Sequence, residues 1–571
     1  METKRVILAI ALSIVIFMGW NFLAREMGWL PPPPDPATYN ASSQADNNAP
    51  AQTAQKGDPA APAAQIPPSA DPSSSQLPAF MPTEGRLVTV ETPLYKAVFH
   101  SNGGVLRQFL LKDYRTSQKE SSPLVNLINE NAASQGPMGI LVYGQPSWLG
   151  KNWALEGEDL ILDAEGTGTL RFTGEFEGMR ITRELQFTGT AYTISEKLHV
   201  ASQEAKSVNL AFTIGTGPLA VDETPGVFAR LRYSIFGGEA PVAGENQYNL
   251  TRIAWFQGSS FDEKESVSDL TEGKLLEGNV AWMGVMNNYF MGAVSMADSA
   301  ASAKGRYLGG VYHALIGRSN LVVSPESPVN LECTYYIGPK EANSLNAAPN
   351  HLDKALDYGF FSIVSKPLIY LLQFLYKYVH NYGVAIILMT IIIKIIFWPL
   401  SQKSYRSMQQ MKQLQPLMLK IREKYADDKE TMNREVMQLY KTYKVNPAGG
   451  CLPILVQLPV FIGLYKALLN SIELRHAPFI STLPFTDIPW LTDLASPDPF
   501  FITPLLMGAT MLLQQKMTPT PGDPMQAKIM MLMPIIFTGL FLTFPSGLVV
   551  YWLVNNIISI GQQWAQLRKG T

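Results

Sequence analysis

The chain has 571 residues, with 45 basic and 47 acidic side chains and a formal net charge of −2, so its overall charge gives no indication of nucleic-acid binding. The two cysteines and six scattered histidines show no zinc-ligand spacing. Neither a GxxxxGKS/T loop nor a GxSxG motif is present, which leaves a nucleotide-driven pump and an α/β-hydrolase without support.

The first segment, residues 1–24, contains an apolar run at 6–23 that follows Lys4 and Arg5. The run lacks an A-x-A cleavage site and is long for the core of a signal peptide. It therefore predicts an uncleaved membrane anchor whose basic start stays in the cytoplasm. Residues 25–82 are rich in Pro, Ala and Ser and predict a disordered linker.

Residues 83–345 show apolar and polar positions with a period of two. The alternating segments are 86–92, 94–100, 169–173, 181–187, 192–200, 208–214 and 329–337. They predict one large β-sandwich, which lies outside the cytoplasm because it follows a single anchor. Its scattered acids can be interpreted as catalytic carboxylates or as a solvated face, and their spacing favours the solvated face; they include Asp222, Glu223, Glu239 and Glu245.

Residues 351–380 are apolar but are interrupted by Lys354, Lys366, Pro367 and Lys377. This pattern predicts an amphipathic helix that lies in the membrane interface instead of crossing the bilayer.

Residues 381–400 predict the second membrane span. Lys394 lies alone in the apolar helix expected at 384–400, about 16 Å and 13 Å from the two ends of the span at 1.5 Å per residue. A cation at that depth costs about 2.5–3.5 kcal/mol on insertion scales. Lys394 therefore either lines a water-filled cavity or snorkels to the headgroups, and its depth favours the cavity. Thr390 shares its face of the helix, one turn away.

Residues 401–447 carry ten basic and five acidic side chains, a net charge of +5 that predicts a cytoplasmic location. Two helices at 403–424 and 429–444 are expected to form a hairpin. Its basic exterior fits a solvated face, acidic lipids or ribosomal RNA equally well.

Residues 448–565 predict four more spans, at 452–469, 500–514, 529–544 and 548–564, and residues 566–571 form a short cytoplasmic tail. The fold class is therefore mixed: a polytopic α-helical membrane protein of six spans, both termini cytoplasmic, with a large extracytoplasmic β-domain. The few polar residues of the spans either line a cavity with Lys394 or join helices; they include Gln457, Thr503, Gln514 and Asn555. A charged, wet cavity open to lipid would admit the polar parts of an incoming chain and so insert helices without ATP.

Several stretches carry a family resemblance. They are LDYGFF at 356–361, WPL at 398–400, LQP at 414–416, KVNPAGGCLPILVQLPVFIGLY at 444–465, SIELRHAPF at 471–479, DPFFITPLLMGATMLLQQKM at 498–517, DPMQAKIM at 523–530 and FPSGLVVYWLVNN at 544–556. Together with the anchor, they make the chain resemble the YidC/Oxa/Alb family of membrane protein insertases, in its Gram-negative form.

The resemblance implies an inner-membrane insertase and chaperone that is not an enzyme. It implies a periplasmic β-supersandwich and five spans around a hydrophilic groove. Lys394 matches the groove position where arginine is usual, Thr390 matches a polar groove position, and Phe501 stands where some members carry tyrosine. The hairpin, with Met408, Met411 and Met418, matches the region that captures clients.

The partners that the resemblance implies are nascent membrane proteins, the ribosome, the Sec translocon and the lipid bilayer. It implies no cofactor, no metal, no specific nucleic acid and no small-molecule substrate.

Other functions compete with this one. An ion-coupled transporter would use Lys394 as a titrating site, but it predicts a repeat between halves that the sequence lacks. An enzyme would use Lys394 as the base for a serine. The nearest candidates are Ser13, Ser546 and Ser559, and only Ser13 is expected at the depth of Lys394. By fold analogy alone, the β-domain could bind a glycan.

Overall fold

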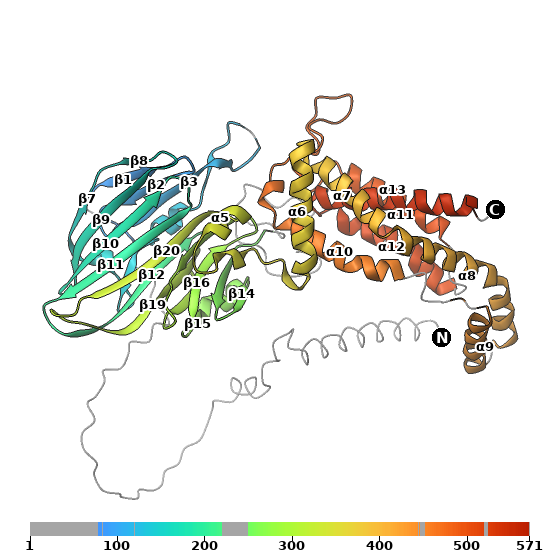
Figure 1. Ribbon diagram of the computed structural model, residues 1–571, viewed down its shortest axis with the longest axis horizontal. Helices are drawn as coiled ribbons and strands as arrows, with labels where there is room; N and C mark the ends of the chain where they lie inside the picture. Colours follow the sequence, from blue (N-terminus) through green and yellow to red (C-terminus); the bar gives the residue numbers. More distant parts are fainter. Residues whose placement is uncertain are drawn as a thin grey trace, which may run out of the picture. The chain divides into compact units, whose positions relative to one another are not determined.

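The computed structural model describes residues 78–82, 84–118, 120–219, 249–426, 428–443, 445, 452–518 and 524–569 (Figure 1). The anchor predicted at 6–23 lies outside these residues. So do most of the linker predicted at 25–82 and the acids Asp222, Glu223, Glu239 and Glu245.

The strands of the described residues form three sheets. The five-stranded sheet has the order β4 (Leu124–Asn126), β3 (Val105–Arg115), β2 (Tyr95–His100), β1 (Leu87–Glu91), β8 (Leu160–Ile161). The nine-stranded sheet has the order β14 (Ser260–Lys264), β13 (Arg252–Gln257), β16 (Val280–Met286), β17 (Phe290–Ser295), β20 (Val329–Pro339), β11 (Thr193–Ser202), β10 (Met179–Thr188), β9 (Thr167–Phe176), β7 (Lys151–Glu156). The six-stranded sheet has the order β15 (Lys274–Leu276), β18 (Ser302–Leu308), β19 (Val311–Val323), β12 (Lys206–Thr216), β5 (Ile140–Val142), β6 (Gln145–Pro146).

The hairpin of β9 and β10 shows how local sequence sets the register. Glu177 and Gly178 connect the strands, and both have positive φ, 49° and 71°. Two successive positive φ angles match the twist of a two-residue hairpin turn. This turn pairs Phe176 with Met179, so that alternate side chains of β10 enter the core.

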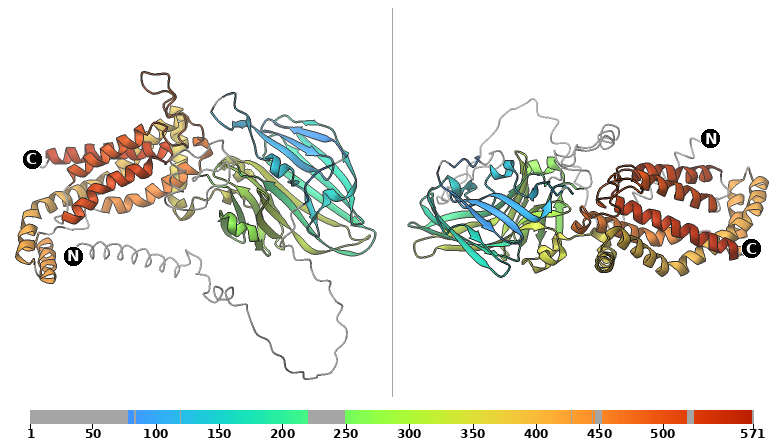
Figure 2. Two further views of the ribbon diagram at one scale, coloured as in Figure 1. Left: turned by 180° about the vertical axis from the view of Figure 1, so that it is seen from behind. Right: turned by 90° about the horizontal axis from the view of Figure 1, so that it is seen from above.

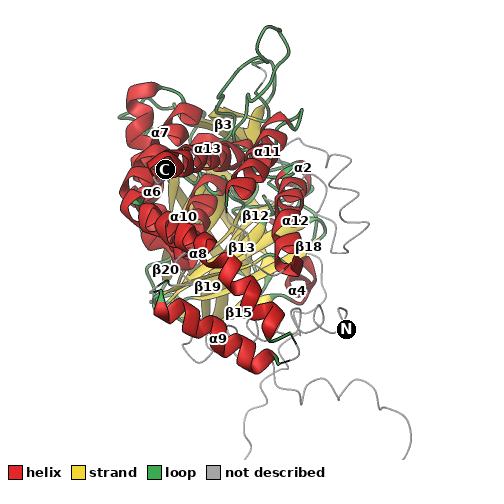
Figure 3. Ribbon diagram, turned by 90° about the vertical axis from the view of Figure 1, so that its right-hand side faces the viewer, coloured by secondary structure: helices red, strands yellow, loops and turns green. Residues whose placement is uncertain are grey.

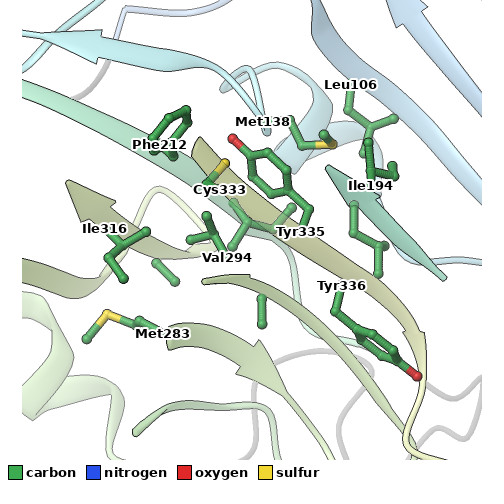
Figure 4. Packing of buried hydrophobic residues seen from close by; sticks show 14 of the residues in the cluster. Leu106, Met138, Ile194, Phe212, Met283, Val294, Ile316, Cys333, Tyr335 and Tyr336 are labelled. Atoms are coloured by element: carbon green, nitrogen blue, oxygen red, sulfur yellow. The ribbon is translucent and has the colours of Figure 1, made fainter. Parts of the chain in front are cut away.

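The sheets share one hydrophobic core. Strands β12 and β19 of the six-stranded sheet contact β16 and β17 of the nine-stranded sheet. Cys333 and Tyr335 of β20 lie in this layer beside Phe212, Val294 and Ile316 (Figure 4). The five-stranded sheet joins the same core, which confirms the large β-sandwich predicted from the alternating segments.

The helices of the described residues include three short ones among or after the strands: α2 (Glu130–Ala133), α4 (Val267–Glu272) and α5 (Ala342–Ala347). The longer helices follow: α6 (Ser362–Val379), α7 (Tyr382–Ile396), α8 (Trp398–Lys424), α9 (Lys429–Thr442), α10 (Leu452–Leu469), α11 (Ile502–Met517), α12 (Pro524–Phe541), α13 (Ser546–Lys569). Helix α7 packs against α6 and α13, α10 packs against α6, and α11 packs against α12 and α13 (Figure 2).

The segment 351–380 is not one helix. Short 3₁₀ turns at Leu352–Ala355 and Gly359–Phe361 precede α6. Helix α6 buries Leu368 and Leu372 against its neighbours and leaves Tyr370 exposed on its other side. It therefore has two apolar faces, one of which the described helices cover.

The continuous helix predicted over 384–400 is wrong, because α7 ends at Ile396 and α8 begins at Trp398 after a bend of 63°. Of the helices that the structure describes, none has by itself the length and hydropathy of a membrane span, but α7 and α8 together do, as a pair bent at the break between them.

Helices α8 and α9 form a hairpin (Figure 3). Asp428 caps the start of α9, because its Oδ1 accepts hydrogen bonds from the backbone N–H groups of Glu430 and Thr431 at 3.1 Å and 3.0 Å. Such a cap satisfies amide groups that have no partner within the helix, and it fixes where α9 begins.

Candidate functional site

The end of α7 determines where Lys394 lies. Lys394 belongs to the last turn of that helix, and Pro399 is the second residue of α8. Proline has no backbone N–H, and its ring clashes with the carbonyl of the preceding turn, so the helix cannot continue straight through Pro399. Lys394 therefore lies beside a helix break, not at the middle of a straight span.

The side chain of Lys394 contacts α13. Its Nζ donates a hydrogen bond to Oγ of Ser559 at 2.7 Å, and the two residues are only 7% and 4% exposed. Ser559 Oγ in turn donates to the backbone carbonyl of Asn555 at 2.8 Å. Because the serine proton is used in this way, a lone pair of Oγ faces the ammonium group.

The expectation that Ser559 lies at a different depth from Lys394 was therefore wrong. The predicted spans themselves gave no ground for it, because Lys394 is six residues before the end of 384–400 and Ser559 is five residues before the end of 548–564. The break after Ile396 and the unbroken 24-residue helix α13 bring the two side chains together.

Two of the polar residues predicted from the sequence, Gln457 and Asn555, contact each other at the face of α13 that also carries Ser559. Gln457 of α10 donates from Nε2 to Oδ1 of Asn555 at 2.6 Å and to the hydroxyl of Tyr551 at 3.4 Å. Gln457 also lines a small cavity of about 10 Å³ together with Lys394. The other lining residues are Ile393, Phe397, Leu400 and Ser401. The structure thus unites Lys394, Gln457 and Asn555 in one polar cluster, which also includes Tyr551 and Ser559.

Other predicted groove residues have different partners. Thr390 is fully buried, and its Oγ1 donates to the carbonyl of Ile386 in its own helix at 2.7 Å. Thr503 donates from Oγ1 to Oδ2 of Asp498 at 2.8 Å, at the start of α11.

Phe501 is the residue that precedes α11, with a left-handed backbone (φ 57°). Gln514 lies in the last turns of α11, where its backbone carbonyl accepts from the N–H and Oγ1 of Thr518 at 3.1 Å and 2.9 Å. No hydrogen bond found in the described part of the chain connects either residue to Lys394.

Sequence reasoning missed part of the polar face of α13. Tyr551, Asn555, Ser559, Gln562 and Gln566 are spaced by four, four, three and four residues. This spacing places polar side chains along one face of a helix. The signal was therefore present in the sequence, and four of these five residues lie inside the span predicted at 548–564.

A second polar contact joins α13 to α11. Asn556 Nδ2 lies 3.5 Å from Oγ1 of Thr510, and Gln563 Nε2 donates to Oγ1 of Thr518 at 3.3 Å. Asn556 and Gln563 are seven residues apart, two helical turns, so they lie on the same side of α13. These contacts fit the interhelical alternative for the polar residues of the spans.

The methionines of the hairpin differ in exposure. Met418 is 4% exposed and accepts a hydrogen bond at its sulfur from the hydroxyl of Tyr440 at 2.9 Å. It packs between α8 and α9 and is not presented to a client in this conformation. Met408 and Met411 are partly exposed.

The loop between α10 and α11 is anchored by Asp493. Its carboxylate accepts hydrogen bonds from the backbone N–H of His476 at 3.0 Å and from Ser496 Oγ at 2.8 Å. Burial raises the pKa of Asp493 above its ordinary value, although these hydrogen bonds favour the charged form. Ser546 Oγ donates to the backbone carbonyl of Asp493 at 3.0 Å, which fixes the start of α13 to this loop.

Comparison with known proteins covers nearly the whole described chain. Residues 87–371 match a family described as the YidC periplasmic domain, and residues 374–570 match a family described as 60Kd inner membrane protein. A protein of Nitratidesulfovibrio vulgaris (strain DP4) described as membrane protein insertase YidC is 53% identical, over 100% of both chains. A relative in Lawsonia intracellularis with the same description is 48% identical, again over 100% of both chains. A solved structure described as an active YidC insertase with the first transmembrane domain resolved is 17% identical, with a TM-score of 0.34, over 85% of this chain and 93% of that one.

Proposed function

The chain belongs to the YidC family of membrane protein insertases, and from this premise we propose that Lys394 is the charged element with which it receives client segments. Family membership makes it an inner-membrane protein with a periplasmic domain, whose substrates are nascent membrane proteins. The role of Lys394 and its groove goes beyond that membership and rests on the geometry of the polar cluster.

One observation supports the proposal most strongly: a buried ammonium group whose described partner is neutral. No carboxylate in the described part of the chain forms an ion pair with Lys394. Ser559 accepts one of the three N–H bonds of the ammonium group but supplies no opposite charge. Since a buried charge is stabilised mainly by an opposite one, a client carboxylate is the natural complement of this site.

The surrounding polar groups support the same function. Gln457 lines the cavity at Lys394, and its amide is hydrogen-bonded to Asn555 and Tyr551. In these surroundings, a client can keep its polar flank hydrogen-bonded while its apolar segment passes into lipid. Burial of that segment supplies about 25 cal/mol per Å², and the membrane potential adds about 2.3 kcal/mol per 100 mV for each translocated charge. No nucleotide is needed for either contribution.

The topology and partners form the finer part of the proposal. Six spans with both termini in the cytoplasm are supported by the +5 charge of residues 401–447 and by the acidic side chains of the loop at 472–498. Chaperone activity and work with the ribosome and the Sec translocon are inferred from the family. The basic surface of the hairpin is the natural candidate for such contacts.

Insertion into reconstituted liposomes without ATP tests the proposal. The substrate is a small client with an acidic residue flanking its span, and the proteins are wild type, Lys394→Arg, Lys394→Ala and Lys394→Glu. Insertion by wild type and Lys394→Arg, with loss in Lys394→Ala and Lys394→Glu, is the expected result. Equal insertion by all four proteins would show that the charge of Lys394 is dispensable.

A further inference from the structure

A second cavity, of about 60 Å³, lies between the first turns of α8 and the last turns of α13. Its lining residues are Trp398, Ser401, Gln402, Tyr405, Gln562, Ala565 and Gln566. It is larger than the cavity at Lys394 and shares only Ser401 with it. None of its lining side chains is charged, so its ligand is not selected by charge.

Gln562 is the unusual residue of this cavity. It is 5% exposed, and neither Oε1 nor Nε2 has a hydrogen-bond partner among the described residues. A buried polar group without a partner destabilises a protein by about 1–3 kcal/mol, so buried amides are nearly always paired. Gln562 therefore contributes to this cavity a side chain whose donor and acceptor are both unpaired among the described residues.

The chemistry of the lining defines the ligand. Gln402, Gln562 and Gln566 each carry a primary amide, which offers a donor and an acceptor at once. A peptide group has the same two functions, an N–H and a C=O. An anionic ligand such as a phosphate would call for arginine or lysine in the lining, and the cavity has neither.

We propose that this cavity binds the main chain of a client, with Gln562 pairing a peptide group next to the residue that meets Lys394. The inference rests on the proposed function and adds a subsite to it. Main-chain hydrogen bonds do not depend on the client's side chains, as in other modes of peptide recognition that use backbone pairing. Such a subsite would hold clients of unrelated sequence.

The two cavities are adjacent. Ser401 lines both of them. Gln562 lies three residues after Ser559, which accepts the hydrogen bond of Lys394, so the two side chains lie on one face of α13. A client carboxylate at Lys394 therefore brings the adjoining peptide groups to the entrance of the glutamine-lined cavity.

The test combines a change in the protein with a change in the client backbone. Gln562→Met removes both polar atoms and keeps the length of the side chain. The probe is a synthetic client with about 20 apolar residues and one flanking aspartate, made also with single peptide bonds next to the aspartate replaced by esters. Gln563→Met is the matched control, because this glutamine is buried on the α11 side of the same helix.

Gln562→Met is expected to lower the initial rate of insertion into liposomes by about tenfold, the effect of about one hydrogen bond. An ester in place of the client peptide bond that Gln562 pairs should slow insertion by wild type to a similar extent. The same ester should have little further effect on the insertion rate of Gln562→Met. Gln563→Met should retain the response to the ester. The inference would be overturned if the ester slowed insertion equally in wild type and Gln562→Met. It would also be overturned if Gln562→Met inserted the unmodified client at the wild-type rate.

Thermal unfolding in detergent separates binding from structure. Because Gln562→Met removes an unpaired buried amide, it should leave the thermal unfolding midpoint unchanged or raise it. A lower midpoint together with loss of insertion would instead identify Gln562 as a structural residue. Lys394→Ala, assayed in parallel, tests the proposed function independently. If Lys394→Ala fails to insert while Gln562→Met inserts normally, the proposed function stands and the main-chain subsite falls.

Discussion

Trp490 donates a hydrogen bond from Nε1 to Oδ1 of Asp498 at 2.9 Å, so a carboxylate that is 1% exposed fastens the loop between α10 and α11 to the start of α11. The same carboxylate accepts from the N–H of Phe500 at 3.0 Å. Its other oxygen accepts from the N–H and Oγ1 of Thr503 at 2.7 Å and 2.8 Å. Asp498 is thus both a helix cap and a loop anchor.

Asp498→Ala should lower the free energy of unfolding by about 2–4 kcal/mol, because it leaves several buried donors without an acceptor. Trp490→Phe removes only one of these hydrogen bonds and should cost about 1 kcal/mol. The thermal unfolding midpoints of both variants in detergent measure the difference. Equal losses would show that the packing of Trp490, and not the carboxylate, anchors the loop.

Ser559→Ala should reduce insertion of an acidic client by about five- to tenfold, because Lys394 loses the hydrogen bond that fixes its ammonium group. Ser365→Ala is the matched control, since Ser365 is a fully buried serine that donates to the carbonyl of Gly463 at 2.9 Å, between α6 and α10. The readout is the ratio of insertion rates for clients with aspartate and with asparagine at the flank. Ser559→Ala should lower that ratio, and an effect of the same size in Ser365→Ala would argue against a positioning role.

The β-domain contains a fully buried ion pair, in which Arg183 Nε donates to Oε1 of Glu196 at 2.6 Å. Arg183 also donates to the backbone carbonyls of Gly104 and Met138 at 3.1 Å and 2.5 Å. Arg183→Met should destabilise the protein by about 3–5 kcal/mol, because Glu196 is left as an unpaired buried charge.

The double variant Arg183→Met, Glu196→Leu should recover much of that loss, since it removes both charges. Chemical unfolding of the single and double variants, followed by circular dichroism, makes the comparison. A double variant as unstable as the single one would assign the loss to the carbonyl groups that Arg183 leaves unpaired.

His313 should make the β-domain sensitive to acid. Burial, aided by the nearby Arg306, lowers the pKa of His313 from 6.5 to about 3, and its Nε2 is hydrogen-bonded to Oε1 of Gln135 at 2.6 Å. Between these two pH values the unfolded chain takes up a proton on this histidine and the folded chain does not. Stability from this group is therefore complete above pH 6.5 and is lost as the pH falls towards 3, by up to about 1.4 kcal/mol per pH unit.

Thermal unfolding as a function of pH checks the sign. His313→Gln should flatten the acid side of the stability profile relative to wild type. His199→Gln, at an exposed position of β11, is the control and should retain the slope. An unchanged slope in His313→Gln would assign the acid sensitivity to other groups.

The alternation of apolar and polar residues in the sequence predicted the strands that have one buried face and one less buried face. Strand β10 alternates along its whole length, and its segment was recognised. Strands β16 and β17 are buried at nearly every position, because the six-stranded sheet packs on them and the segment at Asn350 and His351 contacts Ser295 and Trp282, so their sequences do not alternate. They were missed for that physical reason.

The candidate site was predicted in part. Lys394, Gln457 and Asn555 stand out as polar residues in apolar surroundings, and the structure brings them together. Ser559 and Gln562 were missed as site residues because their importance depends on the packing of α7 against α13 and on the bend at Phe397, after which α8 lies beside α13. Both are tertiary properties that hydrophobic periodicity does not contain.

Because α8 is long and begins at the bend, a small change of angle at Phe397 produces a large displacement at the far end of α8. Helix α8 has 27 residues, so a rotation of about 10° at Phe397 moves its far end by about 7 Å at 1.5 Å per residue. Lys394 is only three residues from this pivot and would move by less than about 1 Å. A change in the angle at Phe397 would therefore displace the far end of the hairpin by several ångströms and leave the ammonium group of Lys394 almost stationary.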